Sequence, residues 1–125
     1  MADLNRVLLI GNLTSDPQMR QTSQGKDMAW FGLAVNQRYR GEDDEIKENV
    51  CFLDVIAWGR LARICAENLK KGSLVFIEGR LRYGSWEEDG DKRSKLEVVA
   101  RKVFLLSVLK SPHFRPEWGD DRTEP

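Results

Sequence analysis

Residues 49–60, NVCFLDVIAWGR, constrain the fold more than any other stretch of this chain. Successive side chains of a β-strand point to opposite faces of the sheet. One face of this segment is small and apolar, formed by Cys51, Leu53, Val55 and Ala57, whereas the other carries Phe52, Asp54, Ile56 and Trp58. The segment therefore predicts a strand that closes an interior on one side. On its outer side it displays two large aromatic rings around an acid, next to Arg60.

Four further segments have strand-like patterns, namely residues 4–13, 27–39, 73–86 and 94–106. The first is apolar on both faces, which predicts cover on both sides. In the second, Ala29, Phe31, Leu33 and Val35 share the expected interior face, and Gly32 suggests a bend or a close backbone approach. Turn residues separate these segments, with an exposed loop expected over 40–47 and a hairpin turn centred on Asp89-Gly90.

Residues 59–69 change to a helical period, because Leu61, Ile64, Cys65 and Leu69 recur at steps of three and four. Lys70-Lys71 and Gly72 are expected to end this helix, with the glycine as a left-handed cap. The resulting order predicts an all-β chain, a five-stranded OB-fold Greek-key barrel with one helix between the third and fourth strands. Residues 1–108 are expected to form this domain, and residues 109–125 a short, polar, disordered tail.

Composition excludes several classes of protein. A chain of 125 residues is the size of one domain and has no apolar run long enough to span a membrane, and its start does not resemble a signal peptide. Cys51 and Cys65 lie in apolar patterns, which predicts buried, reduced thiols in a cytoplasmic protein. The 20 basic residues balance the 20 acidic ones, which by itself argues against a nucleic-acid partner. However, the acids cluster in loop-like stretches at 42–48 and 87–91, so the strands themselves are basic.

The sequence contains no recognisable constellation of catalytic residues. Its single histidine, His113, lies in the tail, and the chain has neither a metal-like Cys/His spacing nor a glycine-rich phosphate loop. The chain is therefore expected to be no enzyme and to need no metal or cofactor.

Single-stranded DNA needs flat apolar partners for its bases and cations for its phosphates. The candidate stacking residues are Tyr39, Phe52, Trp58 and Trp86. The candidate phosphate partners are Arg6, Arg20, Arg38, Arg60, Lys71, Arg80, Arg82 and Arg93. For Phe52 and Trp58, capping the core is an equal alternative, and each arginine alone could be an ordinary surface residue. The alternation of rings and cations, as in Arg82-Tyr83-Gly84-Ser85-Trp86, is more specific than any one of them.

Four runs carry a family resemblance: NRVLLIGNLTSDPQMR, FGLAVNQRY, FLDVIAWGRLA and ENLKKGSLVFIEGRLRYGSW. Through them the chain resembles bacterial single-stranded DNA-binding proteins of the replication type, from Leu4 to about Leu106. The resemblance implies an OB-fold and a homotetramer built as a dimer of dimers. It also implies sequence-independent binding and protection of single-stranded DNA in replication, repair and recombination, in the cytoplasm with the nucleoid. The family's stacking positions fall on Tyr39, Phe52, Trp58 and Trp86, and its basic contacts on Arg6, Arg20, Arg60, Lys71 and Arg82.

Two departures from the family pattern affect these expectations. Asp54 stands between Phe52 and Trp58, where an acid should repel phosphate. The tail ends in GDDRTEP and lacks the terminal phenylalanine through which the family contacts replication and repair proteins, so the tail is shortened or Phe114 or Trp118 replaces it. A second hypothesis is an OB-fold adaptor that mainly binds proteins at a replication fork. Such an adaptor would not need the outward rings.

Overall fold

A computed structural model describes residues 3–108, which form six strands, one α-helix and a final helical turn. Their bounds are β1 Val7–Leu13, β2 Gln18–Gln21, β3 Asp27–Arg40, β4 Ile46–Trp58, α1 Gly59–Asn68, β5 Leu74–Glu88, β6 Asp91–Leu105 and the 3-10 turn η1 Leu106–Val108. The short β2 pairs only with β3, so five long strands build the barrel and α1 lies between the third and fourth of them, as predicted. The predicted tail lies outside the described residues.

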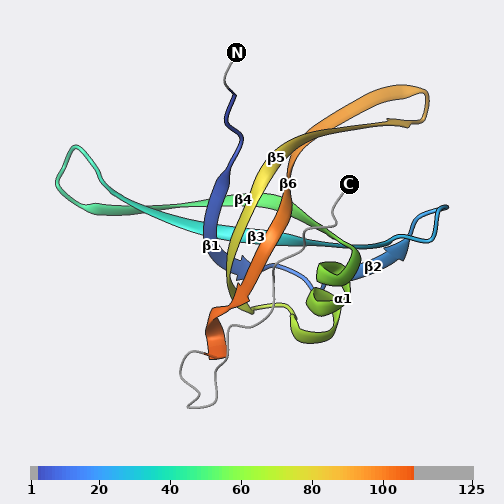
Figure 1. The fold of residues 1–125 in the computed structure, drawn as a ribbon. Helices are drawn as coiled ribbons and strands as arrows, with labels where there is room; N and C mark the ends of the chain where they lie inside the picture. The colour runs from blue at the N-terminus through green and yellow to red at the C-terminus, as the bar shows by residue number, and fades with distance from the viewer. Residues whose placement is uncertain (1–2, 109–125) are drawn as a thin grey trace.

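The sheet closes on itself in the order β1-β5-β6-β4-β3 and back to β1 (Figure 1). Neighbouring strands are antiparallel except β4 and β6, which run parallel with Val55 opposite Val98. The circle is completed where Asn12 of β1 pairs with Ala34 of β3. This closed barrel confirms the predicted OB-fold class.

Side-chain alternation fills the barrel as the sequence predicted. Ala29, Phe31 and Leu33 of β3 and Val55 and Ala57 of β4 have no exposed surface. They belong to one apolar cluster with residues of α1, whose buried side chains are Leu61, Ala62 and Cys65. The helix therefore covers one end of the barrel, and burial of its apolar stripe fixes its position.

The helix itself agrees with the prediction, but its end does not. The C-cap is Leu69, which has an extended backbone and is only 5% exposed. Because Leu69 turns into the core, the helix ends before Lys70 and Lys71. The predicted glycine cap is therefore wrong: Gly72, with φ 91°, belongs to the following turn, where its N–H donates to the Leu13 carbonyl at 2.9 Å.

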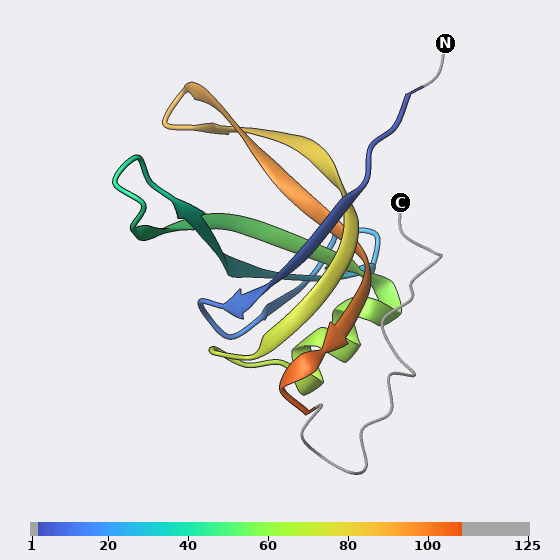
Figure 2. The same ribbon diagram turned by 90° about the vertical axis from the view of Figure 1, so that its left-hand side faces the viewer.

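Two long hairpins extend beyond the barrel on the same side (Figure 2). We call them the β3–β4 arm (residues 36–50) and the β5–β6 arm (residues 80–96). Most of their residues are exposed on both faces, since an arm has no second layer to cover it. The predicted turn at Asp89-Gly90 is confirmed, with both residues at positive φ.

The arms explain where the alternation of inward and outward side chains gave a wrong prediction. Cys51, predicted to face the interior as a buried thiol, is exposed because it lies where β4 leaves the barrel, and Leu81 is exposed at the corresponding place on β5. Conversely, Ile56 was expected on the outward face of β4 but is only 6% exposed, because β4 is buried on both sides near its end.

Candidate nucleic-acid interface

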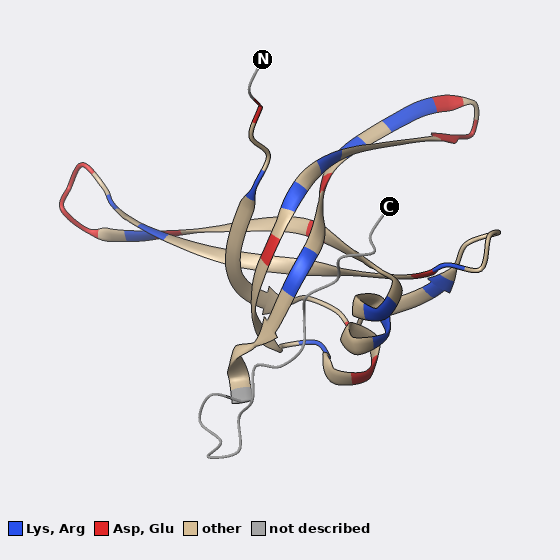
Figure 3. Cartoon of the chain, in the orientation of Figure 1, with Lys and Arg blue, Asp and Glu red and all other residues tan. Residues whose placement is uncertain are grey.

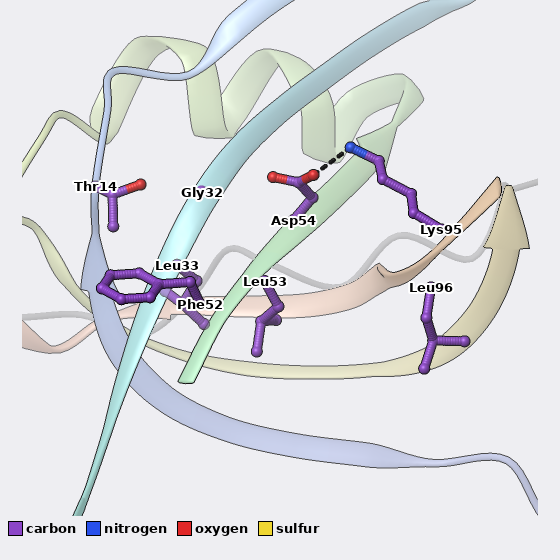
Figure 4. A pocket seen from close by; sticks show the side chains of 8 residues that line it. All are labelled: Thr14, Gly32, Leu33, Phe52, Leu53, Asp54, Lys95 and Leu96. Atoms are coloured by element: carbon purple, nitrogen blue, oxygen red, sulfur yellow. Dashed lines mark hydrogen bonds and ion pairs between the residues drawn. The ribbon is translucent and has the colours of Figure 1, made fainter. Parts of the chain in front are cut away.

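A groove of ≈ 390 Å³ runs between β4 and the start of the β5–β6 arm (Figure 4). It is lined by Thr14, Gly32, Leu33, Phe52, Leu53, Asp54, Lys95 and Leu96. A Cβ on Gly32 would lie 2.2 Å from Thr14 Oγ1, so the glycine lets Thr14 approach β3 directly. The close approach that the sequence suggested at Gly32 is therefore present, and it forms one wall of the groove.

Three of the four candidate stacking rings are displayed to solvent. Phe52 is 71% exposed at the groove, which excludes the alternative that it caps the core. Tyr39 lies on the β3–β4 arm and Trp86 on the β5–β6 arm, 45% and 42% exposed. Rings on both arms and between them suit a flexible strand whose bases stack successively.

Trp58, the fourth candidate, has a different environment. It is half-buried, and its Nε1 is buried without a hydrogen-bond partner among the described residues. Arg82 covers its ring, with Cζ 5.9 Å from the ring centroid. Trp58 is thus partly buried and partly at the surface, so its position excludes neither of the two roles that the sequence left open.

Acidic partners already engage several of the candidate phosphate contacts. Arg38 Nε donates to Glu48 Oε1 at 2.9 Å on the β3–β4 arm. Arg82 Nη2 donates to Glu97 Oε1 at 2.9 Å, and the Glu97 side chain is only 8% exposed. Because Arg82 neutralises a carboxylate that is almost buried, its first role is structural.

Arg6 and Arg80 line a second hollow, of ≈ 340 Å³, formed by the residues just before β1 and by β5 and β6. There the Arg6 guanidinium is paired with Glu78 and lowers the pKa of that carboxyl below its ordinary value. Arg101 and Lys102 lie in the same hollow. The structure therefore does not bring Arg6 and Arg80 together with the groove that holds Phe52.

The remaining candidates come from different elements of the fold. Arg20 is on β2, Arg60 at the start of α1 and Arg93 on the β5–β6 arm, all exposed and without an ion pair to any other described residue. Lys71 is exposed in the turn after α1, where its backbone N–H donates to Asp16 Oδ1 at 2.8 Å.

The charge pattern of the arms agrees with the sequence interpretation (Figure 3). Residues 42–45 of the first acidic cluster lie at the tip of the β3–β4 arm, whereas its last acid, Glu48, lies on the shaft. The second cluster, 87–91, lies at the tip of the β5–β6 arm, and the blue segments of Lys and Arg lie along the shafts. A polyanion would be repelled by the tips and attracted to the shafts.

Sequence reasoning missed two groups in this region. Lys95 was not selected, although it lines the groove, pairs with Asp54, and has its Nζ 5.9 Å from the Trp86 ring centroid. Tyr83 was not selected as a stacking residue, although it is 70% exposed on the β5–β6 arm and accepts a hydrogen bond from Ser94 Oγ at 3.0 Å. The alternation of rings and cations around Arg82 was the available signal for Tyr83, whereas nothing local marked Lys95.

Within residues 3–108, no three His, Cys, Asp or Glu side chains are grouped to hold a metal ion. In the same part of the chain, no helix has the length and apolar character needed to cross a membrane.

The family model of the Single-strand binding protein family matches residues 4–106. The single-stranded DNA-binding protein of Treponema pallidum is 40% identical over 120 residues, which cover 96% of this chain and 68% of that protein. The crystal structure of the wild-type single-stranded DNA binding protein from Thermus aquaticus has a TM-score of 0.72 at 39% identity, covering 82% of this chain and 50% of that one. A Plasmodium falciparum SSB complex with single-stranded DNA shares the fold, with a TM-score of 0.71 at 23% identity.

Proposed function

Since the chain belongs to the single-strand binding protein family, we propose that it binds single-stranded DNA without catalysis and largely without regard to sequence. The observation that carries this proposal is Phe52, which is 71% exposed in a groove between two hairpin arms. A large aromatic ring held at the surface by a rigid strand, in a groove, is available to stack on a base. Each base stacked on such a ring contributes about 1–3 kcal/mol.

The arms define the path that we infer for the strand. Bases would stack on Phe52 in the groove and on Tyr39 and Trp86 along the arms, while phosphates follow the basic shafts. Contacts to stacked rings and to phosphates are common to all sequences, which accounts for binding without sequence readout. We therefore assign the protein to the protection of single strands in replication, repair and recombination, in the cytoplasm with the nucleoid.

The test is a titration with oligo-dT at several salt concentrations. We expect tryptophan emission to fall as bases stack on Trp86, and the logarithm of the binding constant to fall linearly with the logarithm of salt concentration. Duplex DNA of the same length should bind far more weakly, because its bases are not available to the rings. Unchanged emission and anisotropy at low salt would exclude the proposal.

We also propose self-association through the outer face of β1, β5 and β6. Leu8 and Ile10 of β1 are 56% and 53% exposed. Ile10 stands opposite Phe76, and Phe76 opposite Phe104, so three strands present one apolar surface. Such a surface favours an interface between copies, and a homotetramer arranged as a dimer of dimers would cover it. Light scattering of the wild type and of Ile10→Glu tests this, with a smaller assembly expected for the variant.

The alternative, an adaptor that mainly binds proteins, predicts that the rings are dispensable. Replacing Phe52 and Trp86 together by Ala distinguishes the two functions, because only a DNA binder would lose its ligand. Contacts of the tail with replication and repair proteins remain a proposal that concerns residues outside the described part of the chain.

A further inference from the structure

The groove contains an ion pair that joins its two walls. Lys95 Nζ, on β6, donates to Asp54 Oδ2, on β4 (Figure 4). Their side chains are 47% and 36% exposed, so both can be reached by a ligand. The same ammonium lies 5.9 Å from the centroid of the Trp86 ring. One cation therefore contacts the acid of one wall and a candidate stacking ring of the arm.

The Lys95 ammonium of this ion pair can exchange the Asp54 carboxylate for a phosphate. An ion pair exposed to this degree is weak, because water and salt screen it and two side chains must be held in one geometry. A phosphate offers the ammonium an equivalent or better anionic acceptor. It would also arrive with neighbouring bases that can stack on Phe52 and Trp86, whereas Asp54 brings no such additional contact.

We propose that Lys95 is a phosphate-binding residue of this groove and that Asp54 occupies it, in place of a phosphate, when the groove is empty. This inference rests on the proposed function, since it requires single-stranded DNA as the ligand. When the strand enters, the Lys95 ammonium passes from the carboxylate to a backbone phosphate. Asp54 is then left without its partner beside a polyanion. The acid thus positions the lysine in the free protein and lowers the affinity of the complex.

Two variants distinguish this exchange of partners from a static pair, in which Lys95 stays bound to Asp54 when DNA binds. Asp54→Asn frees Lys95 and removes the repulsion, and we expect it to tighten binding about two- to fivefold, the range that corresponds to one exposed pair. Lys95→Gln removes a phosphate contact, and we expect the slope of log K against log salt to become shallower by about 0.7. In a static pair Lys95 never contacts phosphate, so its removal would leave that slope unchanged.

The measurement is fluorescence anisotropy with labelled oligo-dT of about 16 nucleotides, a length within reach of one barrel. Wild type, Asp54→Asn, Lys95→Gln, Lys95→Arg and the double variant Asp54→Asn/Lys95→Gln are titrated over a range of salt concentrations. Lys95→Arg keeps the cation and should keep the wild-type slope. Glu67→Gln makes the same change of charge on the exposed side of α1 and should leave affinity unchanged.

Each outcome decides between the models. A wild-type slope in Lys95→Gln, or equal tightening in Asp54→Asn and Glu67→Gln, would overturn the exchange while leaving DNA binding intact. Wild type that fails to bind oligo-dT at low salt would overturn the proposed function itself. Melting temperatures near the wild-type value are expected because both side chains are partly exposed. If Asp54→Asn did not fold, the comparison of Lys95→Gln with Lys95→Arg would still decide the question.

Discussion

The guanidinium of Arg82 covers the indole ring of Trp58, with Cζ 5.9 Å from the ring centroid. The same guanidinium donates to Glu97 Oε1 at 2.9 Å, and the carboxylate is almost buried. Arg82 therefore links an acid inside the protein to a ring at its surface. Its first role is to neutralise Glu97 and to cover the ring of Trp58.

Arg82→Gln should therefore destabilise the fold. It leaves the nearly buried Glu97 without its cation, a loss of about 1–3 kcal/mol or more. Arg93→Gln removes the same charge from the same arm at an exposed position without an ion pair among the described residues, and should change stability by about 0.5 kcal/mol or less. Urea unfolding of the two variants measures the difference. Equal stability would show that Glu97 does not depend on Arg82.

Phe52→Ala should weaken DNA binding without weakening the fold. The ring is exposed, and loss of one stacked base costs about 1–3 kcal/mol, or roughly ten- to hundredfold in affinity. Ile46→Ala is the matched control, because Ile46 is equally exposed on β4 but carries no ring. Anisotropy with oligo-dT and thermal melting measure the two effects. A Phe52→Ala protein that bound as tightly as Ile46→Ala would remove Phe52 from the site.

The alternation of apolar and polar residues predicted most of the barrel, because every second side chain of the barrel strands is buried there. Phe31 and Val55 point inward for the reason that the pattern gave, and the Asp89-Gly90 turn followed from local backbone chemistry. The pattern failed at Cys51 because period alone does not show where a strand leaves its barrel. The local sequence does not show how far along a hairpin other parts of the protein cover its faces.

The groove was only partly predictable for a related reason. Phe52, Tyr39 and Trp86 could be selected as ring types beside cations, but the contact of Lys95 with Asp54 spans 41 positions. It depends on the parallel pairing of β4 with β6, which sequence patterns do not specify. Likewise, the engagement of Arg82 by Glu97 became visible only when two strands were placed side by side. The residue types indicated single-stranded DNA as the class of ligand, whereas the pairing of the strands decided which cations remain available for phosphate.

The two cysteines should differ in reactivity. Burial raises the pKa of the Cys65 thiol to about 12, whereas Cys51 is exposed at the base of the β3–β4 arm. Because the thiolate is the reactive form, only Cys51 should react with a thiol reagent at about pH 8 in the folded protein. Both should react in denaturant. Cys51→Ser should abolish the native reaction, and two equivalents in the native state would contradict the burial of Cys65.

Stability should fall at low pH in part through Asp27. Hydrogen bonds from Arg63 and Gln21 lower the pKa of this carboxyl below its ordinary 3.8. A depressed folded-state pKa contributes stability that is present above the unfolded value and lost as pH falls through the folded value. Asp27→Asn should therefore melt at a lower temperature than wild type near neutral pH and lose less on acidification below about pH 4. Parallel melting curves at all pH values would contradict this role.

The closure of the barrel depends on the absence of a side chain at Gly11. A Cβ there would lie 2.4 Å from the Ala34 carbonyl oxygen on β3, next to the Asn12–Ala34 pair that closes the sheet. Gly11→Ala must push β1 away from β3, and we expect a loss of about 1–3 kcal/mol, as for overpacking elsewhere in a core. Gly25→Ala is the control, since a Cβ there meets nothing and only its φ of 81° is strained.

Amide exchange separates these two glycine effects better than stability alone. The Thr14 N–H donates to the Gly32 carbonyl at 2.9 Å, just beyond the last β1–β3 pair. When β1 moves outward in Gly11→Ala, this hydrogen bond should open and the Thr14 amide should exchange faster. The strain in Gly25→Ala is confined to the β2–β3 turn and should leave Thr14 protected. Equal protection of Thr14 in both variants would mean that contact between β1 and β3 does not depend on a bare backbone at Gly11.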